Sequence, residues 1–159
     1  MTIATAQRTR RQERFFNPPK AKIKSMLLAA AIRHGIPPAI LLALAEKESH
    51  WTHFTAAGKV LRGSCGPAQQ GIMQINELAH PKAFPRARKD MQYNIDYGAA
   101  LLEQHYQRYQ NWPEAIAAYN RGSVKRRGKK GQLVNQHYVQ DVLLLTKRHV
   151  IPYTPLEQT

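Results

Sequence analysis

The chain has 159 residues, a length typical of one domain, and its 43% hydrophobic content argues against a wholly disordered protein. It carries 24 Lys and Arg against 10 Asp and Glu, and the formal charge of +14 favours an anionic partner: nucleic acid, an acidic membrane surface or an acidic envelope polymer. The single Cys65 excludes an intramolecular disulfide and a cysteine-cluster metal site, and no apolar run approaches the ~20 residues that a membrane span needs.

The sequence predicts a central domain between two tails. Residues 1–20 contain an arginine cluster and close on Pro18–Pro19, so we expect a basic N-terminal tail, followed by a domain over 21–150 and a C-terminal tail over 151–159. The start of the chain lacks the apolar segment that a secretory signal requires. We therefore expect synthesis in the cytoplasm without a Sec signal, and Cys65 as a reduced thiol.

The domain has the patterns of helices joined by short connections. Gly35 and Gly122 are placed as C-terminal caps, and Lys59–Leu61 can join a small hairpin. Gly98 lies on the apolar stripe of the longest predicted helix, which suggests that another helix approaches closely there. The predicted helices are Ile23–His34, residues 37–49, a short one from near Gly71–Ile72, Met91–Tyr109, Pro113–Tyr119 and Leu133–Lys147. The fold class is thus mainly α, a single domain of about six or seven helices.

Glu48 is an unusual residue for its position. Leu41 and Glu48 are seven residues apart, which on a helix brings them within about 20° of each other. Glu48 therefore shares an apolar stripe with Leu41 and Leu44, whereas Glu46 should face solvent. Burial raises the pKa of a carboxyl group, as a general acid near neutral pH requires. The alternative is a structural Glu that pairs with a nearby Lys, Arg or His.

Three segments, in chain order, carry a family resemblance. Glu48–Ser49 ends one predicted helix, Gly71–Asn76 (Gly-Ile-Met-Gln-Ile-Asn) follows a Gly- and Ser-rich loop, and Ala117–Gly122 (Ala-Ala-Tyr-Asn-Arg-Gly) ends a later helix. Asn94–Ile95 with Gly98, and Tyr138–Val139, add weaker matches. This ordered set, over about residues 23–147, resembles the soluble lytic transglycosylase family (the SLT domain, glycoside hydrolase family 23), to which goose-type lysozymes are distantly related.

The resemblance implies a lysozyme-like α fold and cleavage of the β-1,4 bond between N-acetylmuramic acid and N-acetylglucosamine in peptidoglycan. It assigns the acid/base role to Glu48, which would protonate the glycosidic oxygen and then accept the proton of the sugar's own C6 hydroxyl. The product would be a 1,6-anhydro sugar, made without water. One carboxylate suffices because the substrate supplies the nucleophile, unlike in two-carboxylate glycosidases.

The resemblance also assigns the remaining site residues, and it implies neither a metal nor a cofactor. The hydroxyl of Tyr119 would approach Glu48 and tune it, although a core aromatic is the simpler interpretation of Tyr119. Trp51 is either a platform for a sugar ring or a partly exposed core residue. The expected substrate-binding residues are Ser49, Met73, Gln74, Ile75, Asn120 and Tyr138, of which Ser49 could instead cap the helix and Met73 and Ile75 could be core.

Other functions stay open at this point. A goose-type hydrolase would deliver water to the same bond, with Asp96 as a possible second carboxylate, although a helix-end charge is the simpler role for Asp96. Nucleic-acid binding would use the arginine-rich tail and the basic run Lys125–Lys130, but no nucleic-acid module accompanies them. The seven histidines lack metal-ligand spacing. We expect a monomer whose partners are peptidoglycan strands and anionic envelope polymers or lipids, as in a phage endolysin or in a virion or secretion-system component.

Overall fold

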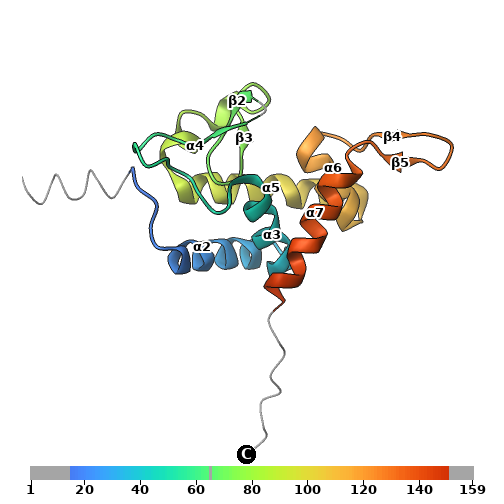
Figure 1. Ribbon diagram of the computed structural model, residues 1–159, viewed down its shortest axis with the longest axis horizontal. Helices are drawn as coiled ribbons and strands as arrows, with labels where there is room; N and C mark the ends of the chain where they lie inside the picture. Colours follow the sequence, from blue (N-terminus) through green and yellow to red (C-terminus); the bar gives the residue numbers. More distant parts are fainter. Residues whose placement is uncertain (1–14, 65, 151–159) are drawn as a thin grey trace, which may run out of the picture.

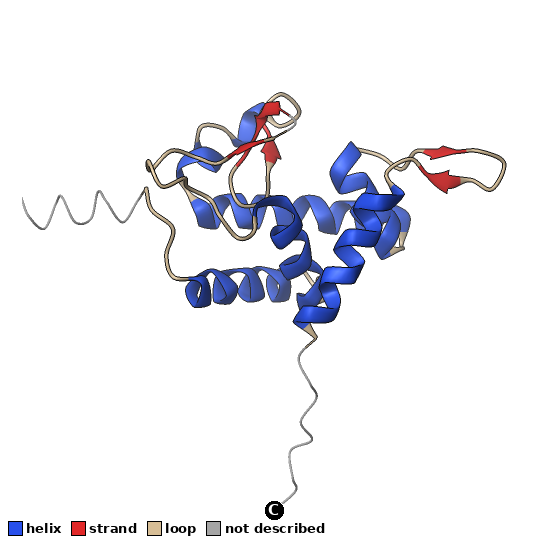
Figure 2. Ribbon diagram, viewed as in Figure 1, coloured by secondary structure: helices blue, strands red, loops and turns tan. Residues whose placement is uncertain are grey.

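The computed structural model describes residues 15–64 and 66–150. The expectations for the first 14 residues, for Cys65 and for residues 151–159 lie outside this part of the chain. Figures 1 and 2 show a helical body with a small lobe of strands on one side and a β-hairpin that projects from one end. Six α-helices occur in the described residues: α2 (Lys20–Arg33), α3 (Pro38–Ser49), α4 (Arg86–Lys89), α5 (Met91–Tyr109), α6 (Trp112–Arg121) and α7 (Gln136–Thr146). The predicted mainly α class is confirmed.

Helix α3 forms the centre of the body. Every residue from Ile40 to Ala45 is buried, with α2 packed on one side and α7 on another. The predicted exposure of Glu46 is wrong, since its side chain is only 19% exposed. A short 3-10 helix, η2 (Lys147–His149), covers it, and Glu46 binds Arg148 at 3.0 Å and His149 at 2.6 Å.

The long helix α5 has the predicted bounds and supports the lobe of strands. Its N-terminus is capped by Asp90, whose carboxylate accepts a hydrogen bond from the Tyr93 amide at 3.0 Å. The close approach at Gly98 is real, but the neighbour is Met73 rather than another helix. A Cβ on Gly98 would lie 2.7 Å from the Met73 Cβ.

The strand lobe occupies residues that the sequence assigned to a loop and a short helix. It is an antiparallel sheet of β1 (Arg62–Gly63), β2 (Gly66–Gln70) and β3 (Ile75–Asn76), and before it Val60 pairs with Phe54 as an isolated bridge. The helix predicted from near Gly71–Ile72 is wrong. Gly71 and Gln74 have φ values of 81° and 50°, which a right-handed helix does not allow, so residues 71–74 form a tight turn between β2 and β3.

Helices α6 and α7 pack against each other and carry a projecting hairpin between them. The hairpin consists of β4 (Arg126–Arg127) and β5 (Gln132–Leu133). Because Leu133 pairs with Arg126, α7 begins three residues later than predicted. Asn111 and Gly122 cap α6 at its two ends.

The segment before α2 is joined to the body. The Asn17 amide donates to the Phe54 carbonyl at 2.7 Å, and the Asn17 Oδ1 accepts from the backbone amides of His53 and Phe54. Helix α2 also starts at Lys20, three residues before the predicted start. In the described residues, none of the helices is long and apolar enough to cross a membrane.

Candidate active site

Glu48 lies at the end of α3, where the chain leaves the core. The helix ends here because His50 and Trp51 have φ values of 52° and 56°, in the left-handed region. Burial raises the pKa of the Glu48 carboxyl from its ordinary 4.5 to about 7, and the hydrogen bond from Tyr138 and the charge of Lys47 oppose this rise. A carboxyl group with such a pKa can both donate and accept a proton near neutral pH.

Tyr138 holds the Glu48 carboxylate from α7. Its hydroxyl donates a hydrogen bond to Oε1 of Glu48. Burial, and then the nearby carboxylate, raise the pKa of Tyr138 well above its usual 10, so the phenol keeps its proton. The ion pairs formed by the described residues do not include Glu48. The structure therefore does not support the alternative of a structural ion pair for Glu48.

Tyr119 lies near Glu48 but makes no hydrogen bond to it. Its hydroxyl donates to the Met73 carbonyl at 2.7 Å, and not to Glu48. Tyr119 is still close enough to Glu48 that the carboxylate, after burial, contributes to raising its pKa. The direct hydrogen bond to the carboxylate thus comes from Tyr138, whereas Tyr119 binds the turn that follows β2.

That turn, Gly71–Gln74, connects the separate segments of the site. The Ser49 hydroxyl donates to the Ile72 carbonyl at 2.7 Å, so the residue next to Glu48 is fixed to the turn. Ser49 also accepts a hydrogen bond from the Thr52 amide. The Gln74 amide donates to the Gly71 carbonyl at 2.9 Å, which orients that side chain within the turn.

Two buried side chains hold the turn from its other side. His53 Nδ1 accepts from the Ile72 amide at 3.1 Å while its Nε2 lies 3.1 Å from the Arg88 carbonyl, and Asn94 Oδ1 accepts from the Met73 amide at 2.9 Å. Burial lowers the pKa of His53 to about 4, so the ring is neutral near pH 7 and Nδ1 carries no proton, which allows it to accept the Ile72 bond. No signal in the sequence indicates this role for His53, because the bond joins segments 19 residues apart.

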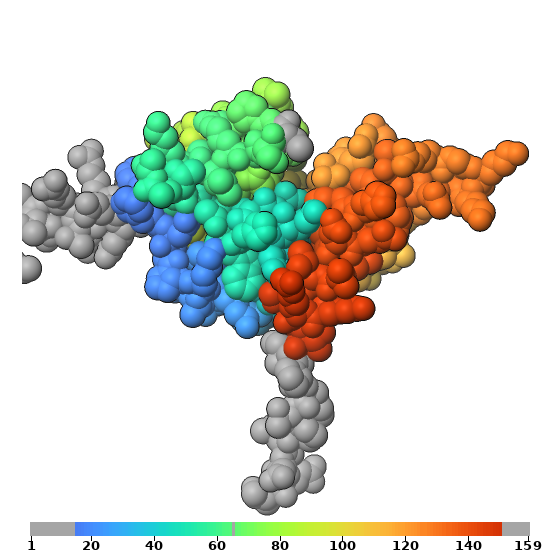
Figure 3. All heavy atoms as spheres, viewed as in Figure 1, coloured from blue at the N-terminus to red at the C-terminus, as the bar shows by residue number. Residues whose placement is uncertain are grey.

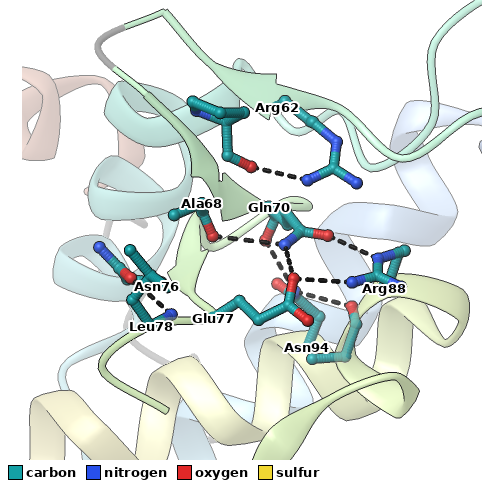
Figure 4. A network of polar contacts seen from close by, with 10 residues as sticks. Arg62, Ala68, Gln70, Asn76, Glu77, Leu78, Arg88 and Asn94 are labelled. Atoms are coloured by element: carbon teal, nitrogen blue, oxygen red, sulfur yellow. Dashed lines mark hydrogen bonds and ion pairs between the residues drawn. The ribbon is translucent and has the colours of Figure 1, made fainter. Parts of the chain in front are cut away.

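A further polar network stiffens β2 behind the turn (Figure 4). The fully buried Gln70 accepts from Arg88 at 2.7 Å and donates to Glu77 at 2.7 Å, and Arg88 also binds Glu77 at 2.7 Å. The Gln70 and Arg88 hydrogen bonds lower the pKa of Glu77, which remains ionised. Asn94 donates to the Gln70 carbonyl at 3.0 Å, so this network and the turn share one support.

Glu48 opens into a groove between the strand lobe and α7. The hollow around it has a volume of about 680 Å³, and its wall includes five of the predicted residues: Glu48, Ser49, Gln74, Asn120 and Tyr138. A second hollow of about 230 Å³ shares Gln69, Gln74 and Asn120 with the first and adds Ile75 and Tyr119, so the two hollows are adjacent and together make up the groove. Arg62 and Gln69 also line it, although no motif in the sequence marks them. Among the described residues, Glu48 is the only carboxylate that lines either hollow.

Comparison with known proteins agrees with this arrangement. A model of the "Transglycosylase SLT domain" matches residues 25–139. The chain belongs to the SLT domain family. Two relatives are Protein IpgF of Shigella sonnei and Protein IpgF of Shigella flexneri, which are 32% and 31% identical to this chain over 112 residues. Each match covers 64% of this chain and 68% of the relative. The family assigns the chain to the lytic transglycosylases, enzymes that act on peptidoglycan.

Three residues that the sequence suggested for the site have side chains outside the groove of this SLT domain. The side chain of Met73 is fully buried against Gly98, and Met73 bonds to Tyr119 and Asn94 through its backbone alone. Trp51 is not a sugar platform: its indole N–H donates to the Leu42 carbonyl at 3.0 Å and its ring lies beside His149. Asp96 pairs with Arg33 on the face between α5 and α2.

The described residues contain no group of three or more His, Cys, Asp or Glu side chains placed to hold a metal ion. Two further hollows of about 600 Å³ each lie around Phe54. Neither includes a predicted site residue, so the groove at Glu48 remains the candidate active site.

Proposed function

We propose that this SLT domain cleaves the β-1,4 bond between N-acetylmuramic acid and N-acetylglucosamine, with Glu48 as the acid and then the base. One observation carries the proposal: Glu48 is the single carboxylate along the groove in the described residues, and burial brings its pKa to about 7. A protonated carboxyl group at neutral pH is the state that a leaving glycosidic oxygen requires.

The proposed reaction uses Glu48 twice. As the bond from C1 to the glycosidic oxygen breaks, the Glu48 proton moves to that oxygen and the sugar passes through an oxocarbenium-like state. The Tyr138 hydroxyl then stabilises the new carboxylate by the hydrogen bond that it already makes to Oε1. Glu48 next accepts the proton of the C6 hydroxyl while that oxygen bonds to C1. The result is a 1,6-anhydro ring and a restored Glu48 carboxyl group, with no water consumed.

The other groove residues support this reaction by binding and positioning. Gln74 and Asn120 line both hollows, and their amide groups are suited to bind the acetamido groups of successive sugars. Ser49 has its hydroxyl hydrogen committed to the Ile72 carbonyl, so we assign it to positioning rather than to substrate binding.

A goose-type hydrolase is the main alternative for this groove, because water could replace the C6 hydroxyl. Inverting glycosidases place a second carboxylate about 6.5–9.5 Å from the first to activate that water. The candidate for this role, Asp96, is held by Arg33 and lines neither hollow. The position of Asp96 supports the lyase.

The test is the substitution Glu48→Gln, which keeps the shape of the side chain and its ability to accept the Tyr138 bond. General acid–base catalysis contributes about 10²–10⁴-fold, so we expect lysis of purified cell walls to fall at least about a hundredfold. Glu103→Gln is the matched control: Glu103 lies on α5 outside the groove and binds His34, so this variant should lyse walls normally. Near-normal lysis by Glu48→Gln would refute the proposal.

A further inference from the structure

The hairpin between α6 and α7 concentrates positive charge at one end of the molecule. Between Ala115 and Gln140 the sequence has six Lys and Arg and no Asp or Glu. Five of these cations lie within Lys125–Lys130, and all five are exposed. Figures 1 and 3 show that this segment projects from the body of the molecule. Much of the local charge is therefore presented to the solvent on a single protrusion, which we call the basic hairpin (residues 125–130).

The basic hairpin is held in shape by its own contacts. Arg126 and Arg127 pair with Leu133 and Gln132 of β5, and the Val134 amide donates to the Lys125 carbonyl at 2.9 Å. Arg126 also donates to the Gly131 carbonyl at 2.8 Å and forms an ion pair with Glu114.

Four of the five cations remain available to a partner. Arg126 is the one hairpin cation with an ion pair in the part of the chain that the structure describes. Lys125, Arg127, Lys129 and Lys130 therefore present their charges to the solvent.

The chemistry of the basic hairpin points to one class of partner. The hairpin is convex and exposed, so it suits a surface better than a small ligand that needs an enclosing pocket. There is no Phe, Trp or Tyr between Tyr119 and Tyr138, and the basic hairpin itself has no aromatic ring on which the bases of a single-stranded nucleic acid could stack. The tip, Gly128–Lys130, also has no apolar side chain to insert into a bilayer. Clusters of four to eight Lys and Arg at one place are typical of binding to anionic lipid headgroups.

We propose that the basic hairpin docks this protein on an anionic phospholipid surface by charge alone. The hairpin connects the helix of Tyr119 and Asn120 to the helix of Tyr138, so a surface bound there lies beside the end of the groove. Docking would keep the groove near the membrane while it stays open to glycan strands. This inference is independent of the proposed cleavage, because neither Glu48 nor any groove residue takes part.

The experiment is sedimentation of the full chain with vesicles of phosphatidylcholine alone or with 30% phosphatidylglycerol, at low salt. The hairpin variant combines Lys125→Gln, Arg127→Gln, Lys129→Gln and Lys130→Gln, and it leaves Arg126 and Arg121 unchanged. The matched control removes four exposed cations elsewhere by Lys22→Gln, Lys24→Gln, Lys82→Gln and Lys89→Gln. Both variants therefore have the same net charge.

We expect the wild-type chain to bind only the anionic vesicles. Each cation near such a surface contributes about fivefold, so the hairpin variant should bind several hundredfold more weakly, while the control loses less than about tenfold. Equal losses in the two variants would overturn the proposal, because they would show a response to net charge and not to this site. Unchanged vesicle binding by the hairpin variant would overturn it as well. A parallel titration with duplex DNA supplies the last outcome. If the hairpin variant loses affinity for duplex DNA and not for the anionic vesicles, the hairpin binds nucleic acid and the proposal is overturned.

Discussion

The hydrogen bond from Tyr138 to Glu48 makes a prediction about the pH dependence of the enzyme. The substitution Tyr138→Phe removes the hydroxyl and keeps the ring. Burial raises the pKa of Glu48, and the Tyr138 bond opposes that rise by stabilising the carboxylate. Without this bond the carboxylate is less stable, so the pKa of Glu48 must rise further above about 7.

The size of the effect follows from the kind of bond that is lost. A hydrogen bond to a charged group contributes about 1.5–3 kcal/mol, and one pKa unit corresponds to about 1.36 kcal/mol. Because the acid form of Glu48 is the active one, activity is lost as the pH rises through its pKa. The alkaline limb of kcat/KM should therefore move upward by about one to two pH units in Tyr138→Phe, with a lower maximum because the carboxylate formed during cleavage is less stabilised.

The assay is the pH profile of kcat/KM on purified cell walls. Tyr106→Phe is the control, because Tyr106 stacks on Trp112 away from Glu48, and its profile should report any titration of the wall itself. An alkaline limb that stays in place or moves downward in Tyr138→Phe, relative to this control, would refute the link between the two residues.

Two further predictions concern stability and the Gly71–Gln74 turn. The folded state holds Glu48 neutral up to about pH 7 whereas the unfolded chain ionises it near 4.5, so the wild type loses stability as the pH rises from 4.5 to 7. Glu48→Gln should therefore become more stable than the wild type by up to about 3 kcal/mol above pH 7, and urea unfolding that shows the same difference at pH 4 and pH 8 would contradict this. The substitution His53→Asn keeps an acceptor for the Ile72 amide, whereas His53→Gln keeps only the donor to the Arg88 carbonyl. We expect the kcat of His53→Asn to stay within about fivefold of the wild-type value and that of His53→Gln to fall by more than about tenfold. Equal losses of kcat in the two folded variants would show that the Ile72 bond does not position the turn.

The parts of the fold that the sequence predicted well are those set by local signals. Helix α5 has an unbroken apolar stripe, and Gly122 ends α6 at the predicted place with a φ of 83°. The Gly71–Gln74 turn was predicted as a helix, because it is stabilised by His53 and Asn94, which no local pattern connects to it. Tertiary contacts of this kind cannot be read from periodicity.

The candidate site divides in the same way. Glu48 is a candidate from its stripe and its motif, and in the structure it is half-buried and lines the groove. The hydrogen-bond partners of the two tyrosines, Met73 for Tyr119 and Glu48 for Tyr138, depend on how α6 and α7 pack, which the sequence does not specify. The exposure of Glu46 was predicted wrongly for a related reason, since η2 returns over α3 from about a hundred residues away.

The most direct test of the central claim is mass spectrometry of the muropeptides that the wild-type enzyme releases from purified peptidoglycan. If Glu48 accepts the proton of the C6 hydroxyl while that oxygen bonds to C1, the new muramic acid ends carry a 1,6-anhydro ring. We expect these ends to dominate the digest and to disappear with Glu48→Gln. Reducing ends, heavier by one water, would contradict this mechanism and identify the enzyme as a lysozyme-like hydrolase.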